Sequence, residues 1–398
     1  MPKVRVGVFK EPVYIVDGVR TPVGKFGRSL KDVPAVDLGA ASIRALIERL
    51  DLEPAMVDLV VMGHVIRAGT GMNTAKQAAI KAGLPRDIEA FNVDMVCASG
   101  MAAIVKAGLL ISHGAASIVV AGGMESMSQA PFILPSSVRW GVRLVYKGAL
   151  GSRDSMVNDG LWDPLNDMVM GEEADETAWE YGATREELDR IAYESHMRAA
   201  RAWDEGFMQK FTVPVTRHGR VLLDYDEGIR LDTSYEKLSK LPPAFTERGP
   251  HTAGNSSQLS DGAAALLLAS GEAVRSLGLK PIARLVAWSY AGVDPRRFPV
   301  APVHAVRGIL GKLGWRVDDV DFWENNEAFA INSLIMNRDL GVPYDRLNVN
   351  GGSIAIGHPL GSTGARITLT LAYTLREKGG RRGIILYALF MDTTTGII

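Results

Sequence analysis

The chain has one cysteine among its 398 residues, Cys97, which lies in the segment Val-Cys-Ala-Ser-Gly directly before an apolar helical pattern. A thiol at the start of a helix meets the positive end of the helix dipole and unpaired N–H groups, and both lower the pKa of the thiol. Because free cysteines are also among the most buried residue types, a simple packing role is the alternative. Cys97 is therefore a candidate nucleophile, and its context must decide between the two roles.

His358 is a second candidate, and it lies in a glycine-rich segment, residues 348–366, that precedes another apolar helix. Histidine is the usual general acid or base near neutral pH, and His–Cys pairs are a recurrent way to activate a thiol. The glycines would let a substrate approach the backbone closely. An incidental histidine in an ordinary turn is the alternative.

Two other polar segments stand out beside these residues. Residues 324–327, Glu-Asn-Asn-Glu, follow a predicted apolar strand, where burying amides and acids is costly unless they are hydrogen-bonded. The N-cap and first turn of a helix are the alternative for this segment. Residues 251–261 are rich in small side chains, and they either cradle a polar ligand chain or only connect two regions.

Composition excludes several classes of function. The net charge is −1 and no cluster of Lys and Arg is present, so binding to nucleic acid or to an anionic membrane is not expected. The sequence has no GxGxxG or P-loop motif, and its seven histidines lack metal-ligand spacing. One cysteine cannot form an intramolecular disulfide, and no apolar run reaches transmembrane length. We therefore expect a cytoplasmic protein without a metal.

The first part of the chain alternates between strand and helix patterns, which predicts a parallel α/β unit. The apolar helix after Cys97 should be buried, because its apolar residues lie nearly all round. The predicted strands are Val13–Val16, Val57–Met62, Ala90–Val93 and Ala116–Ala121, and the predicted helices are Asp37–Leu50, Thr74–Gly83 and Met101–Ser112.

The middle of the chain, residues 127–250, loses this alternation and predicts an insertion over one face of the core. It contains helical segments within Thr177–Trp203 and a hairpin or meander within Phe211–Asp226. The α/β pattern then returns, and segments such as Gly383–Leu389 resemble earlier ones in the same order. This order predicts two similar halves with a site between them. The expected units are residues 1–126, completed by about 251–275, the insertion, and residues 276–398.

Several long motifs occur in an order that resembles the thiolase family. They are VCASG around Cys97, AGGMESMSQAP at 121–131, TAGNSSQLSDGAAA at 252–265, NEAFA at 326–330 and GGSIAIGHPLGSTGAR at 351–366. The resemblance runs from about residue 13 to about residue 383. NEAFA is similar to true thiolases rather than to sterol-carrier thiolase-like proteins or ketoacyl synthases.

The resemblance implies an α/β fold with αβαβα layers, built from two similar halves and an inserted loop domain. It also implies a homodimer or homotetramer that performs reversible Claisen chemistry on acyl-CoA. In that chemistry two molecules of acetyl-CoA give acetoacetyl-CoA and CoA, or a 3-ketoacyl-CoA undergoes thiolysis. Coenzyme A thioester is then a substrate, and no cofactor is implied.

The resemblance also implies roles for particular residues. Cys97 corresponds to the acylated nucleophile, His358 to the histidine that activates it, and Asn326 to the amide that holds a water in the oxyanion hole. Donors of this kind contribute roughly 3 kcal/mol each to lowering a barrier. The implied CoA and substrate contacts are Arg230, Phe245, Ser257, Met170, Ala328 and Phe329.

The C-terminus departs from the family pattern, which normally ends in a Cys-x-Gly-Gly-Gly-x-Gly motif with a second catalytic cysteine. Counting along this chain puts that cysteine at Ala388 or Phe390, with Leu389 between them, and none of the three can transfer a proton. Three explanations are open: impaired Claisen chemistry, another base, or an altered reading of the C-terminus after about residue 383.

If the Claisen step is impaired, the alternative function is a CoA-binding scaffold or a subunit that partners another pathway enzyme. Slow hydrolysis of acyl-CoA is a further possibility. Two smaller departures are Asp94, where the family has Asn, and Val169, where it has His. A carboxylate at position 94 is expected to raise the pKa of Cys97, and Val169 removes a polar contact to the pantetheine region.

Overall fold

The structure is a computed structural model that describes residues 2–141, 151–387 and 392–397. Five strands of the first half lie side by side in the order β4-β3-β5-β12-β1. β3 is parallel to β4 and β5, whereas β12 is antiparallel to β5 and β1. The bounds are β1 (Lys3–Arg20), β3 (Leu59–Gly63), β4 (Glu89–Val93), β5 (Ile118–Ser126) and β12 (Ser260–Ser270).

The second half repeats this arrangement in the order β14-β15-β16-β13. β14 is parallel to β15, and Leu347 forms a parallel bridge to Trp323 at the outer edge of β14. β16 is antiparallel to both of its neighbours, so residues after the undescribed segment 388–391 complete this sheet. The bounds are β13 (Ala283–Gly292), β14 (Phe322–Asn325), β15 (Gly383–Leu386) and β16 (Asp392–Ile397).

β1 connects the two halves, because it pairs with β13 on one side and β12 on the other. Its register against β13 shifts between Val8 and Val13. The sequence predicted only Val13–Val16 as a strand here. The part of β1 before Pro12, which pairs only with β13, was not predicted as a strand.

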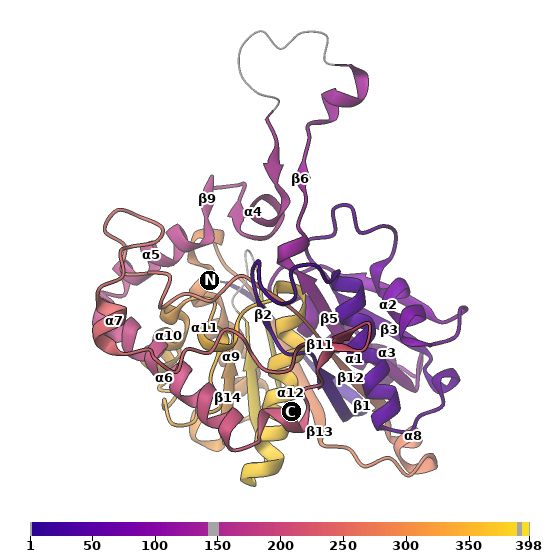
Figure 1. Ribbon diagram of the computed structural model, residues 1–398. Helices are drawn as coiled ribbons and strands as arrows, with labels where there is room; N and C mark the ends of the chain where they lie inside the picture. Colours follow the sequence, from indigo (N-terminus) through magenta and orange to yellow (C-terminus); the bar gives the residue numbers. More distant parts are fainter. Residues whose placement is uncertain (1, 142–150, 388–391, 398) are drawn as a thin grey trace.

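The helices form three layers around these sheets. α3 and α12 pack against each other between the two halves, which gives the central layer (Figure 1). α1 and α2 cover the first half, and α9 and α10 lie on the second. The bounds are α1 (Ala35–Arg49), α2 (Thr74–Ala82), α3 (Ser99–Ser112), α9 (Ala301–Leu313), α10 (Ala330–Leu340) and α12 (Leu360–Lys378).

The middle of the chain is helical and covers the end of the core where the two halves meet. The side chain of Thr184 caps α6 by accepting from Glu187 N. The hairpin within Phe211–Asp226 is present as β10 and β11, and an arm that carries β6 projects from the body (Figure 1). The bounds are α4 (Ser155–Gly160), α5 (Met170–Glu180), α6 (Arg185–Asp204), α7 (Tyr235–Ser239), β6 (Phe132–Ile133), β7 (Arg153–Asp154), β8 (Trp162–Asp163), β9 (Met168–Val169), β10 (Val215–Arg217) and β11 (Arg220–Leu223).

The remaining described strands and α-helices are short, and they are β2 (Gly24–Lys25), α8 (Gly271–Ser276) and α11 (Ser353–Ile356). Within the described ranges, no helix is long and apolar enough to cross a membrane.

The N-terminal ends of α3 and α12 touch backbone to backbone, because both helices carry glycine at the contact. A Cβ on Gly364 would lie 2.1 Å from Met101 N, and one on Gly100 would lie 2.8 Å from Ala365 N. The same glycines therefore bring the turn of Cys97 next to the turn of His358.

Gly364→Ala tests this contact. We expect it to lower the free energy of unfolding by about 3 kcal/mol, because backbone atoms cannot rotate away from the added methyl group. Urea unfolding measures the change. Gly311→Ala in α9 is the matched control, since a Cβ there meets no atom within 4 Å and helix propensity predicts a gain of up to about 1 kcal/mol. Equal effects of the two variants would contradict the proposed close contact.

Candidate active site

Cys97 lies at the end of a tight turn between β4 and α3. Val96 has φ of 45°, a left-handed conformation that is strained for a β-branched residue. Asp94 Oδ1 accepts from Val96 N at 3.1 Å, and Ser99 Oγ donates to Val96 O at 2.6 Å. These bonds hold the strained turn and place Cys97 directly before α3.

Burial has the largest effect on the pKa of the Cys97 thiol, since this residue is only 2% exposed. Desolvation raises its pKa to about 12, and the Glu125 carboxylate adds to this rise, whereas a backbone hydrogen bond lowers it by less. The expected lowering by the helix terminus is therefore wrong, because the loss of water outweighs it. The carboxylate that acts on Cys97 is Glu125, whereas Asp94 bonds Val96 and lies 3.6 Å from Arg67.

His358 is buried, and its hydrogen bonds define its tautomer. Its Nδ1 lies 2.8 Å from Thr363 Oγ1, and that hydroxyl donates to Pro359 O at 2.9 Å. The hydroxyl can therefore only accept from the ring, so Nδ1 carries the proton and the unprotonated Nε2 acts as an acceptor. Burial, followed by the positive charge of Arg366, lowers the pKa of His358 to about 3. The imidazole is neutral at physiological pH.

Asn326 lies against the free nitrogen of this ring. Its Nδ2 is 3.3 Å from His358 Nε2, and its Oδ1 accepts from Ser353 Oγ at 2.9 Å. Arg366 Nη2 in turn donates to Ser353 Oγ at 2.7 Å, which orients that hydroxyl toward Asn326. This buried chain sets the amide so that its N–H groups face the histidine.

A cavity of about 200 Å³ reaches His358 from the surface of the middle region. Its walls are largely apolar, which suits a thioester chain with few charges. Ser257 N donates to Ala328 O at 2.8 Å, and the rings of Phe245 and Phe329 meet edge to face at 5.6 Å between centroids. Of the residues named from the sequence, the cavity is lined by Met170, Phe245, Ser257, Phe329, His358 and also Val169.

Arg230 does not line this cavity and is exposed. Its backbone N donates to His196 Nδ1 at 3.1 Å. Lys25 lies close by, since its pKa is lowered first by burial and then by the charges of Arg230 and Arg28. The carboxylates of Glu227 and Asp232 lie among these three cations. Lys25 and Arg28 were not named from the sequence.

Other residues of the site were also missed. Thr363, Ser353 and Arg366 orient the catalytic candidates through hydrogen bonds. All three lie within GGSIAIGHPLGSTGAR, so the signal was present, but no spacing rule connects Ser353 to Asn326 before the fold is known.

Ala388, Leu389 and Phe390, the positions considered for the second cysteine, lie outside the described residues. Tyr387, the last residue before that segment, is fully buried, and the Cys97 charge is among the causes that raise the pKa of its phenol.

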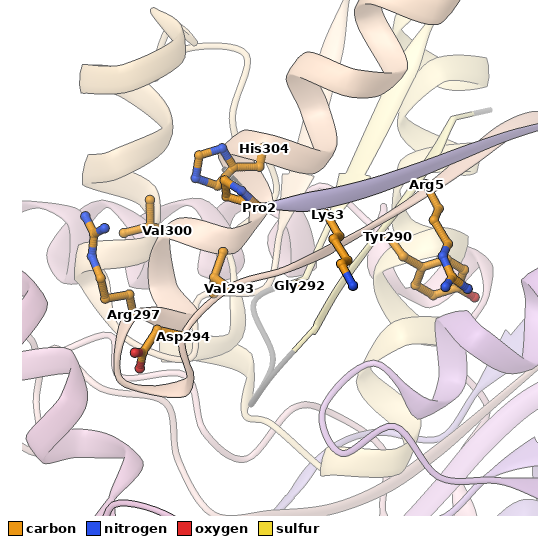
Figure 2. Close-up of a pocket in the computed structure, with 10 residues that line it drawn as sticks. All are labelled: Pro2, Lys3, Arg5, Tyr290, Gly292, Val293, Asp294, Arg297, Val300 and His304. Carbon is orange, nitrogen blue, oxygen red and sulfur yellow. The ribbon is translucent and has the colours of Figure 1, made fainter.

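A cavity of about 700 Å³ lies elsewhere (Figure 2). It is bordered by the start of β1, the end of β13 and His304 of α9, and Lys3 and Arg5 contribute positive charge. None of the residues named from the sequence lines it, so it is separate from the candidate active site.

The buried thiol makes a prediction for chemical reactivity in the absence of substrate. A pKa of about 12 instead of the ordinary 9.0 means that the thiolate fraction is about 1000-fold smaller at neutral pH. Alkylation by iodoacetamide should therefore be slow and should rise about tenfold per pH unit between about pH 7 and pH 10. Intact mass reports Cys97 alone, because the chain has one cysteine. The urea-denatured chain is the control, and a rate that levels off near neutral pH would contradict the raised pKa.

Comparison with known proteins identifies the family. The description "Thiolase, N-terminal domain" matches residues 13–272, and "Thiolase, C-terminal domain" matches residues 279–396. The chain belongs to the thiolase family, and the predicted fold class is confirmed. The second match also extends through β16, beyond residue 383, where the sequence resemblance was expected to end.

Individual relatives cover nearly the whole chain. The acetyl-CoA acetyltransferase of Synechocystis sp. is 44% identical over 375 residues, 94% of this chain and 95% of the relative. The crystal structure of the Bacillus anthracis acetyl-CoA acetyltransferase has a TM-score of 0.93 at 39% identity, covering 98% of both chains. The human mitochondrial 3-ketoacyl-CoA thiolase in complex with CoA has a TM-score of 0.93 at 35% identity, with the same coverage.

Proposed function

We propose that the protein is an acyl-CoA acyltransferase that carries an acyl group on Cys97 during reversible Claisen condensation and thiolysis. Acetyl-CoA is the favoured substrate, because relatives named acetyl-CoA acetyltransferase are 44% identical over nearly the full length. The observation that carries the proposal is the orientation of His358. Its protonated Nδ1 is held by Thr363, which leaves Nε2 unprotonated, as a base requires, and accepting from Asn326 Nδ2.

In the first half of the reaction, His358 Nε2 takes the proton of the Cys97 thiol as sulfur attacks the thioester carbonyl. The new C–S bond forms, the bond from carbon to the CoA sulfur breaks, and the proton passes to the leaving thiolate. The products are acyl-Cys97 and CoA. Both groups are neutral before substrate binds, because burial disfavours the separated thiolate and imidazolium.

Negative charge develops on the thioester oxygen during this attack. Asn326 Nδ2 and the newly protonated His358 Nε2 are two donors that could stabilise it. The chain from Arg366 through Ser353 keeps the Asn326 amide from rotating, so the donor is oriented before the reaction begins.

The apolar cavity would hold the pantetheine and acyl groups, and the cations Lys25, Arg28 and Arg230 would bind the CoA phosphates. We also propose that Met170, Ala328 and Phe329 surround the thioester end. Two of these three line the cavity, and Ala328 fixes the adjacent Ser257 backbone.

The single cysteine favours a second candidate function, because the Claisen step needs a group that removes a proton from the α-carbon of the second acyl-CoA. Cys97 cannot serve as both acylated nucleophile and base. Without a replacement base, the protein would exchange acyl groups with CoA but not join two of them, and it would act as a CoA-binding partner in a larger assembly.

Two assays on the wild-type protein separate these functions. The first follows transfer of isotope from labelled CoA into acetyl-CoA, which needs only acyl-Cys97. The second follows thiolysis of acetoacetyl-CoA by free CoA, which also needs the proton-transfer group. We expect the wild-type protein to show both activities. Exchange without thiolysis would favour the second candidate function. Absence of exchange would refute the acyltransferase proposal.

A further inference from the structure

Glu125 is a buried carboxylate beside the reacting groups for which the proposed reaction has no role. It lies near the end of β5 and is 0% exposed. Its Oε2 accepts from Val65 N at 3.1 Å and from Gly361 N at 2.9 Å, and its Oε1 accepts from Ile66 N at 3.2 Å. A fully buried carboxylate with three backbone donors has a specific structural task.

His64 lies beside the carboxylate, with its Nε2 3.4 Å from Glu125 Oε1. Its Nδ1 is 2.9 Å from Thr74 Oγ1, which also accepts from Asn92 Nδ2 at 2.9 Å. Burial lowers the pKa of His64 to about 4, which keeps this ring neutral.

The bond to Gly361 crosses from one half of the molecule to the other. Gly361 is the second residue of α12, and the N-cap Pro359 offers no side-chain cap. The N–H groups of Ser362 and Thr363 turn back to Pro359 O, whereas that of Gly361 is directed to Glu125. Glu125 is thus a helix cap supplied by the opposite half, where the positive end of the helix dipole favours a negative charge.

The cap lies close to the groups that react. Thr363, in the same turn of α12, holds His358 Nδ1, and the charge of Glu125 reaches Cys97 strongly enough to raise its pKa. Gly123, two residues before Glu125, lies so close to α12 that a Cβ there would meet Gly361 O at 1.9 Å. The end of β5 and the first turn of α12 therefore form one rigid contact.

Resting on the proposed acylation of Cys97, we propose that Glu125 is a positioning residue that holds the first turn of α12 so that His358 faces Cys97. All three backbone groups bonded to the carboxylate are donors, and an added proton would find no acceptor among them. Protonation would therefore weaken at least one bond of the cap. Burial raises the pKa of Glu125 to about 7, so this change falls within the working pH range.

The sign of the pH effect follows from this pKa. Above about pH 7 the carboxylate is charged and the cap is complete, and below it the protonated form predominates. Exchange of label between CoA and acetyl-CoA should lose kcat as pH falls through about 7, with KM unchanged. Among the other titratable groups, the pKa values of His64 and His358 are about 4 and 3 and that of Cys97 is about 12, whereas burial raises the pKa of Glu324 to about 8 and also raises that of Asp94. A limb caused by Glu324 or Asp94 would remain in Glu125→Gln, so this variant identifies the carboxyl responsible.

The test is the pH profile of kcat for this exchange in wild type, Glu125→Gln and Glu125→Asp. We expect Glu125→Gln to lower kcat roughly 10- to 100-fold at about pH 8 with KM changed less than about twofold, and to remove the acid limb. Glu125→Asp keeps the charge and should recover part of kcat together with an acid limb. Glu173→Gln, at another buried carboxyl with a raised pKa, is the matched control and should keep the wild-type profile.

An acid limb that persists in Glu125→Gln, or a wild-type profile without a limb near pH 7, would overturn the proposal. The wild-type profile decides even if Glu125→Gln fails to fold. Wild-type protein without any exchange would refute the proposed acylation itself, a result distinct from exchange that is insensitive to Glu125.

Discussion

Cys97→Ala is expected to reduce exchange of label between CoA and acetyl-CoA to the background rate. The substitution removes the only sulfur nucleophile of the chain, and no other side chain can accept the acyl group in the same place. Removal of a catalytic nucleophile typically costs several orders of magnitude, because the remaining groups act only together with it. The measurement is the initial rate of label transfer at saturating acetyl-CoA.

This variant should remain folded and should still bind CoA, since Cys97 is buried in a hydrophobic cluster where alanine is also accommodated as a small apolar residue. Calorimetric titration with CoA is therefore the control. Exchange at more than about one tenth of the wild-type rate would contradict the assignment of Cys97 as nucleophile.

His358→Gln is expected to slow exchange roughly 100- to 10,000-fold, the usual contribution of a positioned general base. Glutamine keeps a polar group of similar length but cannot take the thiol proton. The pKa of His358 is about 3, so wild-type imidazole is already neutral above that pH and adds no acid limb at higher pH. Exchange rates at several pH values measure both effects.

Two further variants make this result specific. Thr363→Val removes the acceptor for His358 Nδ1 together with the hydroxyl's bond to Pro359 O, and it should slow exchange less than His358→Gln, by about tenfold. His113→Gln changes an exposed histidine and should have no effect. Equal rates for His358→Gln and wild type would show that another group takes the thiol proton.

Much of the fold could be predicted from the sequence, because the strands and helices of the first half carry clear apolar patterns. The predicted helices Asp37–Leu50 and Thr74–Gly83 differ from α1 and α2 by only a residue or two at their ends. The start of β1 was not predicted, although Val4, Val6 and Val8 alternate with Lys3, Arg5 and Gly7, because its pairing with β13 joins residues about 280 to 290 positions apart.

The candidate site could be predicted less completely than the fold. The reacting candidates Cys97, His358 and Asn326 could be named from motifs, because their residue types are chemically distinctive. Their ionisation could not be predicted, since the pKa of Cys97 depends on burial that only the assembled halves produce. Glu125 was present in a recognised motif, but its bond to Gly361 joins residues 236 positions apart.

Acylation of Cys97 by acetyl-CoA is the central claim, and intact-protein mass spectrometry of the quenched mixture tests it most directly. We predict the addition of one acetyl group per chain, located on the peptide that contains Cys97 and removed when free CoA is added before quenching. An unchanged mass, or an acetyl group on another residue that free CoA does not remove, would contradict the account.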